Sequence, residues 1–150
     1  MVGSWPQQDH PYLTAASCKV TSKADTRYNC IAWAAKDDLK FWWPDQMGIG
    51  YWPAGITREV TIGAFVGAYE TLGYKLCHQG TLEPGLEKIA IFGTGPSGSE
   101  IPTHAALQLE SGEWTSKMGT LEDISHKTVD AVSGPVYGNV ICYMSRPRLP

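Results

Sequence analysis

Cys30 and His104 are the two residues of this sequence whose types and settings together favour catalysis. Cys30 begins a segment with helical spacing, and His104 opens an alternating apolar run that predicts a strand. A thiol nucleophile needs a base beside it, and many cysteine hydrolases take the Cys from an early helix and the His from a later strand. We therefore expect a Cys30/His104 pair that acts on an amide, isopeptide or thioester bond without a metal or other cofactor.

The helix that would carry Cys30 is predicted over residues 27–40, with Asp25, Thr26 or Asn29 as its N-cap. Cys30 would then lie in the first turn, where free N–H groups and the helix dipole favour the thiolate and lower the pKa of the thiol. The same N–H groups, with the Asn29 side chain, would bind the oxyanion that develops during acyl transfer.

A third polar residue is needed to orient the imidazole of His104. A two-residue turn at 111–112 would place Ser116 on the opposite face of the sheet from His104, whereas a three-residue turn would place both on one face. Asp123 is the first choice because a carboxylate stabilises an imidazolium, followed by Ser116 and then Gln108. We expect His10, His78 and His126 in surface loops, with His126 as the nearest alternative member of the site.

Tryptophan is abundant near Cys30, since four of the six Trp residues fall between positions 33 and 52. Large aromatic side chains usually pack in a core. Our functional interpretation assigns Trp33, Trp43 and Trp52 to substrate binding, together with Asn29 and Gln108. The expected substrate is a peptide or another amide-bearing molecule.

Length and composition predict one domain over residues 1–150, with an irregular arm over 1–24 and a core over 25–146. A second helix is expected from Thr57 or Thr61 to Leu72, ended by Gly73. Strands follow it with a period of two. Their predicted ranges are 74–78, 88–92, 104–109, 114–117 and 139–144.

Charge and hydropathy exclude several classes of protein. The formal net charge of −3 and the absence of a basic run argue against nucleic acid as a partner. No stretch has the length of a membrane span, and the N-terminus lacks the pattern of a signal peptide. We expect a cytoplasmic protein, or an effector secreted without a classical signal peptide, whose four Cys residues are reduced thiols.

Two resemblances rest on these residues. The segments 28–34, 103–109 and 114–119 (YNCIAWA, THAALQL and WTSKMG) are similar to a family of uncharacterised bacterial proteins. The order of a Cys helix and a His strand resembles the papain-like superfamily, especially its NlpC/P60 members. This resemblance implies an α+β fold in which N-terminal helices pack on an antiparallel sheet. NlpC/P60 enzymes usually have Asp-Cys-Ser-Gly around the nucleophile, whereas this sequence has Asn29-Cys30-Ile31-Ala32. Their third catalytic residue is usually a His, at a position that corresponds roughly to Ser116 here.

Two other functions compete with the hydrolase. One is a non-catalytic protein-binding or immunity-type module on a papain-like scaffold, with the Trp-rich loop over residues 42–52 as its contact surface. The other is a zinc site formed by Cys30, His104 and Asp123. The arrangement of Cys30 and His104 in three dimensions discriminates among these functions.

Overall fold

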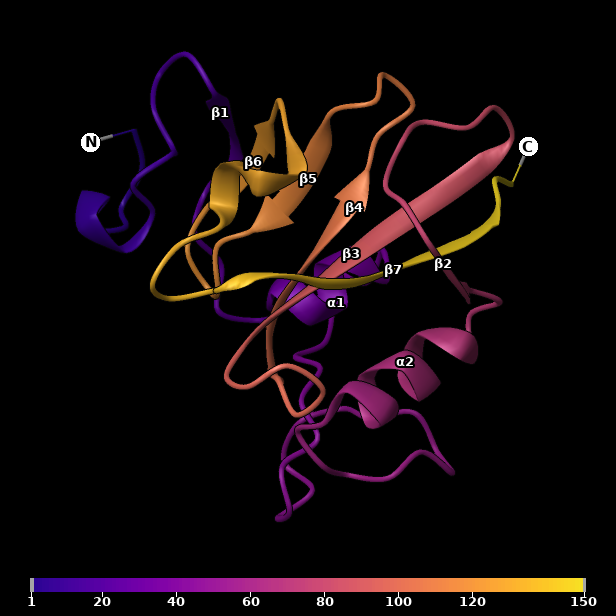
Figure 1. The fold of residues 1–150 in the computed structure, drawn as a ribbon. Coiled ribbons are helices and arrows are strands. Elements are labelled where there is room, and N and C mark those ends of the chain that lie inside the picture. Colours follow the sequence, from indigo (N-terminus) through magenta and orange to yellow (C-terminus); the bar gives the residue numbers. More distant parts are fainter. Residues whose placement is uncertain (1, 150) are drawn as a thin grey trace.

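The fold is built on one antiparallel sheet of seven strands. A computed structural model describes residues 2–149, and its strands run in the spatial order β1-β6-β5-β4-β3-β7-β2 (Figure 1). The strands are β1 (Cys18–Ser22), β2 (Lys75–Cys77), β3 (Leu86–Thr94), β4 (Ile101–Gln108), β5 (Trp114–Lys117), β6 (Asp123–His126) and β7 (Asn139–Pro147). The helices are α1 (Cys30–Ala34) and α2 (Ile62–Glu70), with 3-10 turns η1 (Gln7–Asp9) and η2 (Val129–Val132).

The two central strands, β3 and β4, are paired along most of their length, but β4 and β5 are not. Pairing between β4 and β5 is confined to Leu107 with Thr115 and Gln108 with Trp114. Beyond Leu107, β4 continues toward His104 beside β3, while β5 continues beside β6. The sheet therefore opens between β4 and β5, next to the predicted catalytic histidine.

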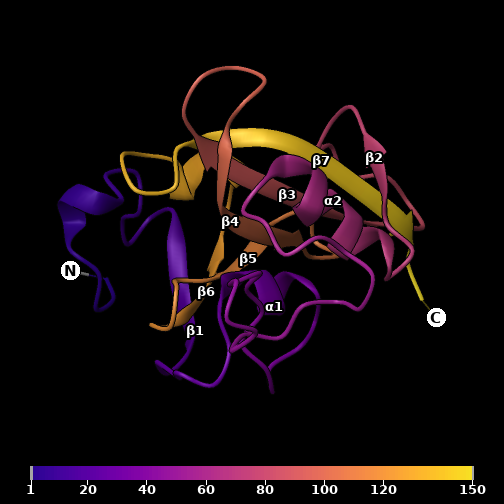
Figure 2. The same cartoon turned by 90° about the horizontal axis from the view of Figure 1, so that it is seen from below.

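Each face of the sheet carries its own apolar core. Ile91, Ala105 and Leu107 point to one face, where they pack with side chains of α1 and α2. Figure 2 shows both helices against the sheet from below. Because successive residues of a strand point to opposite faces, Phe92 and Ala106 face the other way. There the N-terminal arm and the segment 131–137 cover the sheet.

The predicted papain-like α+β fold is wrong, because the sheet dominates this protein and its helices are short. The first helix ends at Ala34 instead of residue 40. Lys36 adopts a positive φ of 63°, and the Asp37 carboxylate accepts the backbone N–H groups of Leu39 and Lys40, so the chain turns away. Two strands were also missed: β1, within the predicted irregular arm, and β6, to which it pairs at the edge of the sheet.

The second helix and the five predicted strands are confirmed, with changes at their ends. Thr61 caps α2 by accepting the N–H of Ala64, as its position before the apolar stripe indicates. The strand at 114–117 has the predicted bounds, whereas β3, β4 and β7 begin earlier or end later than expected. Within residues 2–149, no helix combines the length and apolar character that a membrane crossing requires.

A buried carboxylate joins the end of the sheet to the loop after α1. Glu87 on β3 is only 2% exposed, and its oxygens lie 2.5 Å from Lys36 Nζ, 3.0 Å from Arg146 Nη2 and 3.4 Å from Arg148 Nη1. Its pKa is lowered because the ion pairs and hydrogen bonds from Lys36 and Arg146 outweigh the effect of burial. These cations come from separate segments, so the carboxylate holds β3, β7 and the α1 loop together.

We predict that Glu87→Ala lowers the free energy of unfolding by about 3 kcal/mol, because it leaves three cations without their common partner. Urea denaturation followed by tryptophan fluorescence would measure the loss. Arg27→Ala is the matched control, since it removes an exposed Arg side chain paired with Asp25 and should lower the free energy of unfolding much less than Glu87→Ala does. Equal losses for the two variants would refute the structural role of Glu87.

Candidate functional site

The first turn of α1 lies at the opening between β4 and β5, since α1 contacts both strands. Asn29 caps the helix, and Cys30 is its first residue. The Cys30 sulfur is within hydrogen-bonding reach of the backbone N–H of Ala105, the residue that follows His104. The fold therefore places the predicted nucleophile beside the segment that carries the predicted base.

The thiol of Cys30 is protonated in this environment. Its side chain is 5% exposed, and burial raises its pKa to about 11, although the backbone N–H groups of Ala105 and Ile31 act in the opposite direction. The low pKa predicted from a helix start is therefore wrong for the resting state. A thiolate at this position forms only when a base accepts the thiol proton.

The imidazole of His104 is completely buried on the other face of β4. Its ring stacks on Tyr137 at 3.9 Å between centroids and meets the edge of Phe92 at 5.3 Å. Its Nε2 lies 3.0 Å from Ser116 Oγ, and its Nδ1 has no hydrogen-bond partner. Cys30 and His104 thus approach the opening between β4 and β5 from opposite faces of the sheet.

A chain of three hydrogen bonds defines which ring nitrogen of His104 carries the proton. His126 Nδ1 lies 2.7 Å from the carbonyl oxygen of Thr128, so this nitrogen donates. His126 Nε2 must then accept from the Ser116 hydroxyl, 2.8 Å away. Ser116 Oγ in turn accepts from His104 Nε2, which leaves Nδ1 of His104 as an unprotonated nitrogen with a free lone pair.

Both imidazoles of this chain are neutral. Burial lowers the pKa of His126 to about 4, and the carbonyl of Thr128 offsets only part of this shift. Burial also lowers the pKa of His104 well below its ordinary value, and the nearby His126 adds to the effect. A neutral imidazole can accept a proton, so the unpartnered Nδ1 of His104 can serve as a base.

Ser116, not Asp123, contacts His104. The hairpin after β4 has the three-residue turn, with Leu109 N–H bonded to the carbonyl of Glu113, and this register places Ser116 on the face of His104. Asp123 is on the other face and accepts hydrogen bonds from Tyr28 and Ser22. Gln108 donates to the carbonyl of Gly80, near the far end of the strand.

Hydrogen bonds to the backbone hold the side chain of Asn29. Its Oδ1 accepts the N–H groups of Ala32 and Trp42, and its Nδ2 donates to the carbonyl of Trp42 at 2.8 Å. These bonds use the side chain to cap α1 and to hold the loop that follows. The predicted oxyanion role of Asn29 stays a prediction, for which the second N–H of its amide and the backbone N–H groups are available.

The three tryptophans assigned to substrate binding do not share one set of contacts. Trp33 is half-buried and donates from Nε1 to Thr115 Oγ1 at 3.1 Å. Trp43 and Trp52 both pack against Phe65 of α2, and Trp52 is buried with its Nε1 bonded to the carbonyl of Thr57. Of these, Trp33 lines a pocket beside α1.

His126 is the member of the site that the sequence analysis misplaced. It was expected in a surface loop, but it is buried in β6. No local alternation marks this strand, because Ile124 is its only apolar residue. Among residues 2–149, no three Cys, His, Asp or Glu side chains lie close enough to share a metal ion, so the zinc site from Cys30, His104 and Asp123 is not formed.

The two neutral histidines make stability depend on pH. The unfolded chain binds protons at His104 and His126 near pH 6.5, whereas the folded chain does not, so stability is complete above that pH and falls as the pH decreases toward 4. The loss from His126 alone should reach roughly 3 kcal/mol at pH 4.

Urea denaturation at several pH values would measure this loss. Replacing His126 with Gln removes one titrating group, and the slope of stability between pH 6.5 and pH 4 should become shallower. An unchanged slope in this variant would show that His126 is not the buried neutral group that the hydrogen bonds indicate.

Comparison with known proteins identifies the family but gives no function. No curated protein and no solved structure matches this chain. One family model matches residues 19–145, and it is described as a domain of unknown function, DUF7689. The match extends from β1 to β7 and includes every residue of the site, but no link to the NlpC/P60 family is found. The chain belongs to the DUF7689 family.

Proposed function

We propose that this protein is a cysteine-dependent hydrolase or acyl transferase in which Cys30 is the nucleophile and His104 is the base. The observation that carries the proposal is the free lone pair on Nδ1 of His104, which the bonds to Ser116 and His126 enforce. Cys30 is beside Ala105, the next residue of the same strand. An imidazole with this tautomer can accept the thiol proton once its Nδ1 and the sulfur come within hydrogen-bonding distance.

The reaction would begin with transfer of the Cys30 proton to His104 Nδ1. The sulfur then attacks the carbonyl carbon of an amide, isopeptide or thioester, and the carbonyl electron pair moves to oxygen. Collapse of this intermediate breaks the bond to the leaving group, which takes the proton from His104. Water or another acceptor then attacks the thioester on Cys30, with His104 as the base, and restores the free thiol.

Backbone groups would stabilise the negative charge in this reaction. The N–H groups of Ala105 and Ile31 already lie within reach of the Cys30 sulfur. They favour the thiolate once the proton has moved to His104. Ser116 and His126 act as positioning residues, because they hold the ring and its proton without contacting the sulfur.

Alkylation of the four cysteines by iodoacetamide tests the proposal. Burial alone makes Cys30 the slowest to react, since Cys142 has a similarly raised pKa of about 11 but is more exposed. Activation by His104 predicts that Cys30 reacts faster than Cys142 at pH 7.5, and that His104→Gln slows Cys30 by roughly 100-fold. Mass spectrometry of peptides would measure the four rates.

Cys77 is the internal control, because iodoacetamide should alkylate it at the same rate in the unsubstituted protein and in the His104→Gln variant. A Cys30 that reacts more slowly than Cys142, with no effect of His104→Gln, would contradict the proposal. Thermal melting of the variant would show whether a slower reaction reflects lost activation and not a changed fold.

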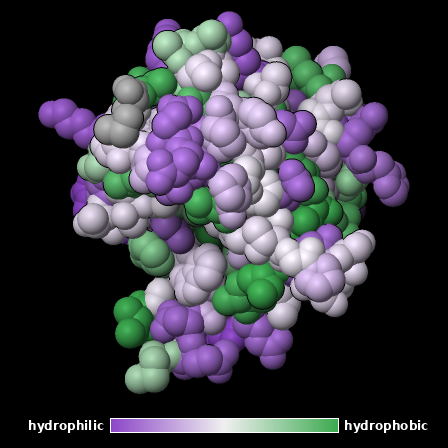
Figure 3. All heavy atoms as spheres, turned by 60° about the vertical axis from the view of Figure 1, so that its left-hand side comes forward, coloured by the Kyte–Doolittle hydropathy of each residue, from purple (hydrophilic) through white to green (hydrophobic). Residues whose placement is uncertain are grey.

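A second candidate function, a protein-binding module, is favoured by the exposed apolar side chains of the loop before α2. Met47 and Ile49 are 83% and 86% exposed, and Phe41 and Tyr51 are also exposed. Figure 3 shows hydrophobic atoms among hydrophilic ones on the lower part of the molecule, where Figure 1 places this loop. Exposed apolar side chains that gather in one place are typical of an interaction site.

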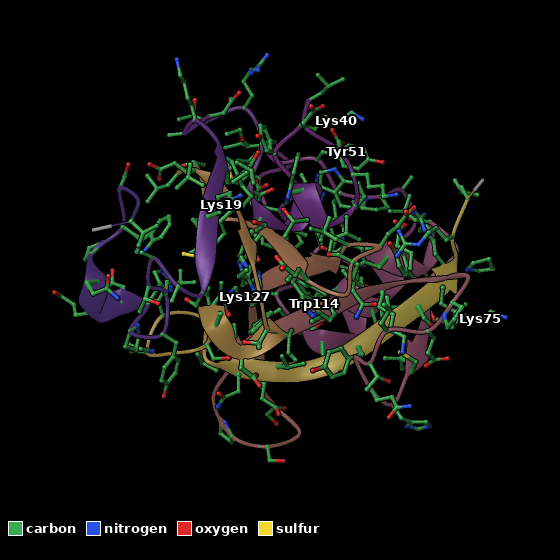
Figure 4. All side chains as sticks on the ribbon, turned by 90° about the horizontal axis from the view of Figure 1, so that it is seen from above. Lys19, Lys40, Tyr51, Lys75, Trp114 and Lys127 are labelled. Carbon is green, nitrogen blue, oxygen red and sulfur yellow. The ribbon has the colours of Figure 1, made fainter. Side chains whose placement is uncertain are left out.

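This loop has a defined shape despite its exposed residues. The Asp45 carboxylate accepts the N–H groups of Ile49 and Gly50, and Arg58 donates to the carbonyls of Asp45 and Gly50. Lys40 lies over the ring of Tyr51 at 4.8 Å, and Figure 4 shows these two side chains together. A preorganised loop loses less conformational entropy when it binds a partner.

For this second candidate, the double variant Met47→Asp/Ile49→Asp should abolish co-purification of a partner from cells that naturally produce the protein. Both side chains are exposed, so the free energy of unfolding should change by less than about 0.5 kcal/mol. Leu82→Asp is the matched control, because Leu82 is an exposed apolar residue outside the loop. The same set of co-purified proteins for both variants would exclude the loop as the contact surface.

A further inference from the structure

We infer that the pocket between α1 and the strands β5 and β6 binds a small organic cation, such as an amine that carries an apolar group. The pocket has a volume of about 480 Å³, which is within the usual range for small-molecule sites. Figure 2 shows α1 next to β5 and β6 on this face of the sheet. Neither Cys30 nor His104 lines the pocket, so this inference is independent of the cysteine chemistry.

The pocket has an apolar wall and a polar floor. Leu107, Leu109 and the half-buried ring of Trp33 form the apolar part. Trp33 is fixed by its bond to Thr115, whose hydroxyl donates to the carbonyl of Ile124. These residues are held by β4, β5 and β6, so the wall is preformed and could receive an alkyl or aryl group without rearrangement.

The carboxylate of Asp123 gives the pocket its charge. Asp123 is 2% exposed and lines the pocket. Its Oδ2 accepts hydrogen bonds from the hydroxyls of Tyr28, at 2.7 Å, and Ser22, whereas its buried Oδ1 has no partner. A buried carboxylate that lacks part of its hydrogen bonds is costly, and the positive charge of a ligand in the pocket would stabilise it.

The nearby lysines form their close contacts with groups other than this carboxylate. Within residues 2–149, Asp123 makes no salt bridge. Lys117, opposite Asp123 on β5, donates to the carbonyl of Leu121 and lies over the ring of Tyr28 at 4.5 Å. Lys36 lines the pocket but is paired with Glu87 at 2.5 Å.

A second carboxylate, that of the exposed Asp38, also lines the pocket. With Lys36 committed to Glu87, the groups free to act on a ligand are therefore mainly anionic. The combination of two carboxylates with an apolar wall selects a ligand that is basic at one end and apolar at the other.

Titration with 2-phenylethylamine tests this inference, with the neutral 2-phenylethanol as the comparison ligand. Isothermal titration calorimetry at pH 7 should show that the amine binds at least about tenfold more tightly than the alcohol. Asp123→Asn should remove this preference, while the affinity for the alcohol stays the same. The Asn side chain can still accept the hydrogen bonds from Tyr28 and Ser22, so the fold should be retained, and thermal melting would verify this.

Asp38→Asn is the matched control, because it removes one exposed carboxylate and should weaken amine binding less than Asp123→Asn does. Chemical-shift changes at the indole N–H of Trp33 would locate the ligand. Equal affinities for amine and alcohol, no binding of the amine, or an amine affinity unaffected by Asp123→Asn would each overturn the inference.

Discussion

The limited pairing of β4 with β5 is the constraint on which the site depends. Hydrogen bonding between these strands stops at Leu107 and Thr115, so the sheet opens where α1 begins. Cys30 approaches this opening from the helical face and His104 from the other face. A continuous sheet would separate the two side chains. The opening lets a nucleophile from the core on one face of the sheet approach a base from the core on the other face.

The polar chain from Thr128 to His104 compensates for this break in the sheet. Ser116 bridges β4 and β6 through two buried imidazoles, and every donor in the chain has an acceptor. Within this set of hydrogen-bonded groups, His104 Nδ1 is left unsatisfied. An unpaired polar atom in a core is destabilising, and such atoms often mark functional positions.

Cys30 and His104 are both neutral in the resting site. The site therefore differs from one that holds a preformed thiolate–imidazolium pair. Burial raises the pKa of Cys30 and lowers the pKa of His104, so the proton stays on the sulfur. Reaction of the Cys30 thiol therefore depends on transfer of its proton to His104. Opening of the site to water would reverse both shifts, because both are caused mainly by loss of solvent.

Local sequence patterns predicted the parts of the fold that depend on local interactions. The strand at 114–117 and the helix capped by Thr61 follow from periodicity and capping. The length of α1 did not, because its end depends on the left-handed conformation of Lys36. The edge strand β1 is stabilised only by pairing with β6, more than 100 residues away.

The same holds for the candidate site: the residues marked by local patterns were predicted, and those placed by strand pairing were not. Cys30 and His104 stand out by residue type and by their predicted elements. The choice of Ser116 over Asp123 depends on the turn at 110–112, and the sequence allows two registers there. His126 joins the chain through the pairing of β5 with β6, which no local pattern indicates.

Long-range ¹H–¹⁵N correlation at pH 7 would measure the protonation state of the imidazole nitrogens of His104. The hydrogen bonds predict that the His104 ring is neutral, with its proton on Nε2 and a free lone pair on Nδ1, and that the His126 ring carries its proton on Nδ1. A proton on Nδ1 of His104, or a charged ring at this pH, would contradict the proposed role of His104 as the base for Cys30.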